Sequence, residues 1–169
     1  MTNGALSMDE TRKLLRHFLA ALAYRTQKAL RDAPSDFGGF RAGPKVRTPH
    51  ELIRHMDSLL GYSRTLFIGG SYRAPLLPEF GAAVAHFHAT LADVARHLEL
   101  GTGLNSITPE QLLQGPLSDA MTHAGQLAIL RRLAGSPVPS ESFIDADISP
   151  ENLGPNQPLP VRPDGDWRP

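Results

Sequence analysis

The sequence of 169 residues predicts an all-α protein in which four long amphipathic helices form a bundle, followed by an extended tail. Apolar residues recur at helical spacing in four long stretches. Capping boxes of the Ser/Thr-x-x-Glu/Gln type mark helix starts, and no alternating run is long enough to build a sheet. Helices with an apolar and a polar face bury the apolar faces against one another, which favours a bundle.

The first two helices have clear start signals. The first is expected to begin near Ser7, where "SMDE" forms a capping box with Glu10, and to end at "RDAPSD". The second opens at "TPHE", where Thr48 caps the helix, a proline takes the first helical position and Glu51 completes the box. It is expected to end at "IGGSYRAP".

Residues 34–47 form a Gly- and Pro-rich loop between these helices. It does not match a P-loop, because no Gly-Lys-Ser/Thr follows a strand. The segment is either a plain connection or part of a binding site. In the second case its large side chains would shape the mouth of that site: Phe37, Phe40 and Arg41.

The second half of the chain adds two long helices and one short one. The third helix follows Pro78 and ends at "GTG", with the clearest apolar stripe in the chain. "TPEQ" at 108–111 starts a short helix. Gly115-Pro116 is expected to break the chain, after which the fourth long helix runs to Gly135.

The composition changes after Gly135. Eight of the fifteen prolines lie in residues 136–169, where acidic residues outnumber basic ones six to two. We therefore divide the chain into a helical bundle domain, 1–135, and an extended Pro-rich tail, 136–169, that packs on the bundle or is mobile.

Composition also limits the function. Lys plus Arg and Asp plus Glu are equal at 17 each, so charge gives no support for nucleic acid or a membrane as partner. The absence of cysteine excludes disulfides, thiolate ligands and a cysteine nucleophile, and any thiol must come from a cofactor or substrate. The N-terminus "MTNGALSMDETRK" has no apolar signal-peptide region, and no apolar run could span a bilayer. We expect a cytoplasmic protein.

Three residues form a candidate metal site. Asp119 and His123 lie four positions apart, so on a helix they project from one face, separated by one turn. His55 borders the apolar stripe of the second helix and can face this pair if the second and fourth long helices are neighbours. Two imidazoles and one carboxylate leave a coordination position open, as in catalytic sites for zinc or a first-row relative.

The same residues also have structural explanations. Asp119, near a helix start, could complement the helix macrodipole, and a histidine on an apolar face is often a hydrogen-bonded core residue. His88 is interpreted as a core or pocket histidine. Gln126 or His88 could contact a ligand or orient bound water, whereas Arg131 is expected at the surface. The remaining histidines are expected on polar faces, in solvent or at caps: His17, His50, His86 and His97.

Three segments resemble the DinB-like (DinB/YfiT) superfamily. "TPHELIRHMDSLLGYSRTLF" is similar to the second helix of these proteins, and "GPLSDAMTHAGQLAILRRLAGSPV" to their fourth. "ENLGPNQPLPVRP" is similar to the tail of some members. The resemblance covers most of residues 8–162 and is most specific in the motif of the fourth helix.

This resemblance implies a four-helix bundle with a long crossover, commonly a homodimer. It also implies a divalent metal (zinc, nickel or iron) held by His55, Asp119 and His123. Many members have His-x-x-x-His on the fourth helix, and the mycothiol-dependent maleylpyruvate isomerase branch has Glu-x-x-x-His. The present chain has Asp, one methylene shorter than Glu.

Two functions follow as hypotheses. Relatives of the resembled family use low-molecular-weight thiols such as bacillithiol or mycothiol, which implies a metal-dependent S-transferase or isomerase-like enzyme acting on a small-molecule substrate. The alternative is a non-catalytic helical bundle that binds a small molecule or a partner, with the metal optional.

Overall fold

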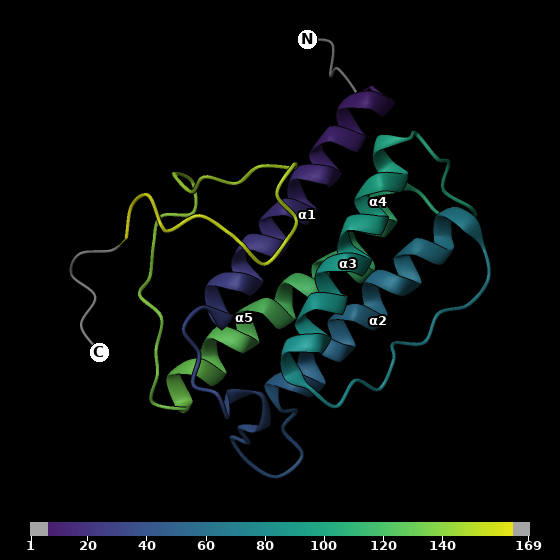
Figure 1. Cartoon of the computed structure of the whole chain (residues 1–169). Helices are drawn as coiled ribbons and strands as arrows, with labels where there is room; N and C mark the ends of the chain where they lie inside the picture. The colour runs from purple at the N-terminus through teal and green to yellow at the C-terminus, as the bar shows by residue number, and fades with distance from the viewer. Residues whose placement is uncertain (1–6, 164–169) are drawn as a thin grey trace.

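The computed structural model describes residues 7–163, which are all-helical apart from connecting segments and the tail (Figure 1). No β-strand occurs within 7–163; one isolated antiparallel bridge joins Glu141 to Pro163. The all-α prediction is confirmed. The outer ends of the two predicted units, residues 1–6 and 164–169, lie outside the described residues, as does the start of the N-terminal stretch examined for a signal peptide. The elements are α1 (Met8–Leu30), η1 (Phe37–Gly39), α2 (Pro49–Ile68), α3 (Phe80–Glu99), α4 (Pro109–Leu112), η2 (Leu113–Leu117) and α5 (Ser118–Leu133).

The predicted capping boxes define the starts of α1 and α2. The Glu10 N–H donates to Ser7 Oγ at 3.2 Å and the Ser7 N–H donates to Glu10 Oε2 at 2.7 Å. Thr48 and Glu51 form the same pair of bonds, at 3.2 and 2.7 Å. Each box satisfies two backbone donors that the first helical turn leaves free.

Each long helix packs against two others: α1 against α3 and α5, and α2 against α3 and α5. The segment 69–79 returns along the length of α2, so α2 and α3 run parallel (Figure 1). Side-chain pairs early and late in the two helices show this direction, since Asp57 lies beside His86 and Phe67 stacks on His97. The core between the four helices is apolar and includes the fully buried Leu19, Leu22, Ile53, Met56, Leu60, Phe87, Leu91, Leu117 and Leu127.

At Gly115-Pro116 the helical path is kinked but continues, rather than stopping and starting again as predicted. Residues 113–117 form one wide turn of π-helical type, in which only Gly115 has non-helical dihedral angles, φ −88° and ψ −108°. The Ser118 hydroxyl donates to the Leu113 carbonyl at 2.7 Å, which satisfies an acceptor exposed by the kink. The kink therefore connects α4 to α5, whose first turns pack beside α2.

Arg131 is not at the surface, as expected from the sequence, but almost fully buried. Its guanidinium donates to the carbonyls of Ala29 at 3.0 Å, Arg31 at 2.9 Å and Ser136 at 2.8 Å. The last carbonyls of a helix have no partner within the helix. Arg131 supplies donors for those at the end of α1 and thereby joins α1 to α5.

At two other residues, Phe37 and His97, a neighbouring element covers the side chain, which rules out one of the two alternatives left open for Phe37 and contradicts the expected exposure of His97. Phe37 does not shape the mouth of a site but is buried edge-on against Phe80, with ring centroids 6.5 Å apart. His97 is not solvated: its ring is buried and stacks on Phe67 at 5.6 Å, nearly parallel.

The described part of the tail, residues 136–163, lies against the helices without forming a helix itself (Figure 1). The Tyr24 hydroxyl donates to Glu141 at 2.9 Å, and Lys28 forms an ion pair with the same carboxylate at 2.9 Å. Further along, Arg31 donates to the Gln157 carbonyl at 2.9 Å. Polar bonds thus join α1 to this segment, and the Phe143 ring adds contacts with Tyr24 and Arg25.

Candidate metal centre

The packing of α2 against α5 brings together the three residues proposed as metal ligands. His55 comes from the second turn of α2, and Asp119 and His123 come from the first two turns of α5. His123 Nε2 lies 3.3 Å from Asp119 Oδ1, and His55 Nε2 lies 3.9 Å from Asp119 Oδ2. One ligand atom from each residue can be chosen so that all lie within 4.8 Å of one another. We call these residues the His–Asp–His cluster.

The cluster is open to solvent on one side. The exposed side-chain fractions are 9% for His123, 32% for His55 and 49% for Asp119. The two imidazole rings meet edge to face, with centroids 4.7 Å apart. A small molecule could therefore approach the cluster from the Asp119 side.

The electrostatic surroundings favour an uncharged His55. Burial lowers the pKa of His55 below its usual value, the positive charge of Arg47 and the neighbouring His123 lower it further, and Asp119 opposes the shift. A metal-ligating imidazole must be neutral. The environment of His55 thus favours the form that can bind an ion.

Gln126 positions the His123 ring. Its Oε1 lies 2.8 Å from His123 Nδ1. A carbonyl oxygen can only accept a hydrogen bond, so Nδ1 carries the proton and Nε2, which faces Asp119, holds the free lone pair. From the sequence, Gln126 was predicted to contact a bound small molecule or water; in the structure it contacts His123, a candidate metal-binding residue.

His88 lies apart from this arrangement. It is buried on α3, and its Nδ1–H donates to the Leu153 carbonyl of the tail at 2.7 Å. Burial lowers the pKa of His88, although the bond to Leu153 partly opposes this. Of the two pocket candidates, only Gln126 contacts the His–Asp–His cluster.

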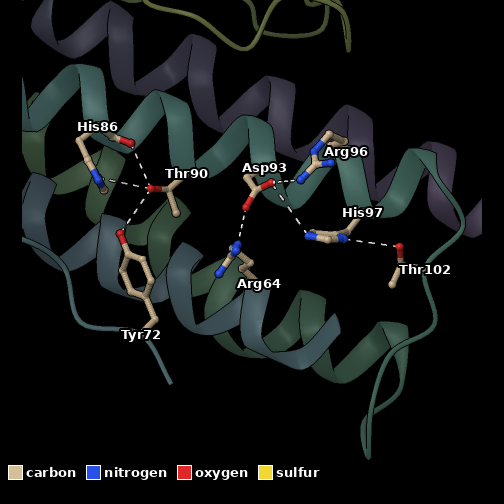
Figure 2. Close-up of polar contacts among 8 residues, drawn as sticks. All are labelled: Arg64, Tyr72, His86, Thr90, Asp93, Arg96, His97 and Thr102. Atoms are coloured by element: carbon tan, nitrogen blue, oxygen red, sulfur yellow. Dashed lines mark hydrogen bonds and ion pairs between the residues drawn. The ribbon is translucent and has the colours of Figure 1, made fainter. Parts of the chain in front are cut away.

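A second group of histidine and carboxylate, which was not predicted from the sequence, lies on the other side of α2. The Tyr72 hydroxyl donates to Asp57 Oδ2 at 3.0 Å, and His86 Nδ1 lies 3.2 Å from the same oxygen. Thr90 lies 3.4 Å from both the Tyr72 hydroxyl and the His86 ring (Figure 2). We call these four residues the Asp57 cluster. Burial raises the pKa of Tyr72 to about 12, so its hydroxyl remains a donor.

Further along the same helix pair, Asp93 on α3 forms ion pairs with Arg64 on α2 and Arg96 (Figure 2). Residue types alone do not distinguish these acids from Asp119. The sequence did contain one indication that Asp57 does not belong with His55. Residues two apart on a helix point about 200° away from each other, so Asp57 had to face a different neighbour from His55.

The atoms that the His–Asp–His cluster offers for coordination suit a divalent metal. His123 Nε2 and the Asp119 oxygens are acceptors, and neutral His55 can offer a lone pair as well. Acceptors that converge without a donor repel one another unless a proton or a cation lies between them. Two imidazoles and a carboxylate suit zinc or a first-row transition metal.

No family of known proteins, no curated protein sequence and no solved structure matches the chain. Within residues 7–163, no helix is both long and apolar enough to cross a membrane.

Proposed function

We propose that this protein is a DinB-like, divalent-metal-binding protein that holds its ion between α2 and α5. The observation that carries the proposal is the convergence of His55, Asp119 and His123 from two separate helices. The nitrogen and oxygen donors suit zinc, nickel or iron. The shorter Asp side chain reaches the histidines, because Asp119 Oδ1 approaches His123 Nε2 to 3.3 Å.

The proposed activity is a thiol-dependent S-transferase or isomerase-like reaction on a small molecule. The chain has no cysteine, so a low-molecular-weight thiol would bring the sulfur. A bound divalent ion would lower the pKa of that thiol and present it as a thiolate. The protein contributes Gln126, which keeps the His123 lone pair directed at the site, and the open side beside Asp119, where the thiol and the substrate can enter.

The proposal includes the finer architecture and the assembly. The parallel α2 and α3, joined by the long segment 69–79, support a four-helix bundle with a crossover (Figure 1). The Pro-rich tail 136–169 would pack on this bundle, as the bond between His88 and Leu153 supports. Following the same resemblance, we propose a cytoplasmic homodimer.

Metal analysis of protein purified without a polyhistidine tag tests the metal site. We expect near-stoichiometric zinc, nickel or iron in the wild type and its loss in H123A. H86A is the matched control, because His86 also lies beside a carboxylate but belongs to the Asp57 cluster. Metal-free wild-type protein whose thermal stability does not respond to divalent ions would support the non-catalytic alternative.

The chemistry needs a separate experiment. The metal-loaded protein is incubated with an electrophile and with bacillithiol, mycothiol or glutathione, and loss of free thiol is followed. We expect the wild type to consume one of the three thiols catalytically, and we expect this activity to be absent in D119A and H123A. A metal-loaded protein that is inactive with all three thiols would favour a binding role.

A further inference from the structure

A basic cavity of about 440 Å³ lies beside the candidate metal centre. The loop before α2 and the first turns of α2 form its walls, and His55 is part of its lining. Four other lining side chains are cationic, Arg41, Lys45, Arg47 and Arg54, and only one, Glu51, is acidic. The chain as a whole has equal numbers of acidic and basic residues, so this excess of positive charge is local.

The protein itself neutralises little of this charge. Glu51 is engaged by the Thr48 N–H at 2.7 Å in the capping box and approaches only Arg41, at 4.0 Å. Within residues 7–163, no hydrogen bond or ion pair links Lys45, Arg47 or Arg54 to a carboxylate. The Arg54 Nε is shielded from solvent and has no hydrogen-bond partner. A buried charged donor without an acceptor is unfavourable, and an anion in the cavity that Arg54 lines would offset this cost by pairing with the guanidinium charge.

A second, apolar cavity of about 510 Å³ lies next to the basic one. Val46 and Arg47 belong to the lining of both cavities. Gln126, which is bonded to the candidate ligand His123, lines the apolar cavity, as His55 lines the basic one. The other apolar lining residues are Ala42, Leu52, Ile129, Leu130 and Leu133. The metal centre is therefore bordered by a basic cavity through His55 and by an apolar cavity through Gln126.

We propose that the basic cavity binds an acidic group, a carboxylate or a phosphate, of the small molecule on which the metal centre acts. The apolar part of that molecule then lies in the second cavity. This inference rests on the proposed function, because it assigns the class of ligand for the same centre. Arg47 and Arg54 hold the acidic group through charge-assisted hydrogen bonds, for which the guanidinium fork is well suited.

The test measures binding of two anions and a neutral analogue to the protein as purified and after zinc loading. The probes are succinate, inorganic phosphate and succinamide, titrated while the arginine Nε–H signals are followed by NMR and the affinity by calorimetry. We expect at least one anion to shift the Arg54 signal, and succinamide to leave it unchanged. Succinate and phosphate together distinguish a carboxylate from a phosphate ligand.

Three variants make this test specific to the cavity. R47Q and R54Q should each weaken binding of the anion by about tenfold, the effect of losing one charge-assisted hydrogen bond. R73Q is the matched control, because Arg73, like Arg47, is an exposed arginine in a loop between helices, but it lines neither cavity. Unchanged affinity in R47Q and R54Q, an equal loss in R73Q, or equal binding of succinamide would overturn the proposal.

The outcomes separate this inference from the metal proposal. Arginine-dependent anion binding to a protein that takes up no metal would support the basic cavity and contradict the metal centre. A protein that binds stoichiometric metal but shows no arginine-dependent anion binding would support the metal centre and contradict the basic cavity. Anion binding that persists in H123A but is lost in R54Q would show that the cavity acts independently of the ion.

Discussion

Helix α2 contributes to two histidine–carboxylate clusters on opposite sides. The aspartates of the two clusters differ in their hydrogen-bond partners and in their exposure to solvent. His55 joins Asp119 and His123 toward α5, whereas Asp57, two residues later, lies beside His86 and Tyr72 toward α3. The Asp57 side chain is 5% exposed; its Oδ2 accepts from the Tyr72 hydroxyl, whereas its buried Oδ1 has no hydrogen-bond partner within residues 7–163. Asp119 is 49% exposed and faces imidazole nitrogens, of which His123 Nε2 is an acceptor.

The comparison shows that residue types alone do not define a metal site. Both clusters contain histidine and aspartate within 4 Å. In the Asp57 cluster a protein hydroxyl donates to the acid, and the Asp57 carboxylate is buried, although the His86 side chain is 38% exposed. In the His–Asp–His cluster no hydroxyl of the described residues donates to Asp119, and the acid lies on a side that is open to solvent, so that cluster can accept an ion.

The largest expected effect on stability contrasts the two acids. D57A should lower the free energy of unfolding of the metal-free protein by about 2 kcal/mol, because the partly buried Tyr72 hydroxyl and His86 lose their acceptor. D119A should change it by no more than about 0.5 kcal/mol, as expected for a half-exposed residue. Urea denaturation of both variants measures this difference, and equal losses would contradict the assignment of Asp57 as the structural acid.

The next prediction concerns the side chain that orients His123. Q126A should weaken metal binding by about tenfold, the lower end of the range for residues that hold a ligand in place. Q126E should retain affinity, because its carboxylate can also accept from His123 Nδ1–H. Competition with a chromophoric chelator measures both affinities. If Q126A bound the metal as tightly as the wild type, the tautomer of His123 would have to be controlled in another way.

A smaller effect tests how tightly the Asp57 cluster is closed. A Cβ at Gly61 would lie 2.0 Å from Tyr72 Cδ1, so the ring must move and loosen its bond to Asp57. The clash outweighs the helix propensity gained on replacing glycine, leaving a net loss of about 1 kcal/mol in G61A. G125A on α5 is the control, since its Cβ meets nothing within 4 Å, and it should gain up to about 1 kcal/mol. Thermal unfolding of both variants would show opposite signs.

The smallest expected effect concerns His88, which should influence the pH dependence of folding stability but not that of metal affinity. Because burial lowers the pKa of folded His88 below 6.5, the unfolded chain binds a proton below pH 6.5 that the folded chain does not. Stability should therefore be fully present above pH 6.5 and fall as the pH decreases toward the folded pKa. H88Q should reduce this slope between pH 5 and 6.5 in urea titrations of the metal-free protein.

Metal affinity should also fall with pH, since His55 and His123 must be neutral to bind. This dependence should persist in H88Q, because His88 bonds to the tail rather than to the His–Asp–His cluster. Measuring metal affinity of H88Q at pH 5.5 and 7.5 checks it. A pH-independent affinity in H88Q would place His88 in the metal centre.

Local signals predicted much of the structure and part of the candidate site. The starts of α1 and α2 were predictable because Ser7 and Thr48 pair with glutamates three residues later, within one helical turn. The pair Asp119 and His123 was predictable because helical geometry fixes the relation of residues four apart. Their meeting with His55 depended on α2 packing against α5, which the sequence suggested only by resemblance.

The sequence by itself determined where helices begin, which of their faces are apolar and which residues carry ligand chemistry, because these properties arise within a few residues of each other. Only the tertiary structure decided which polar groups were already satisfied. Arg131 finds its acceptors on α1, about a hundred residues earlier, and Asp57 finds Tyr72 and His86 across a loop and a neighbouring helix. Such partners meet only when the apolar faces pack, so whether an acid is a structural acceptor or an open ligand depends on the packed fold.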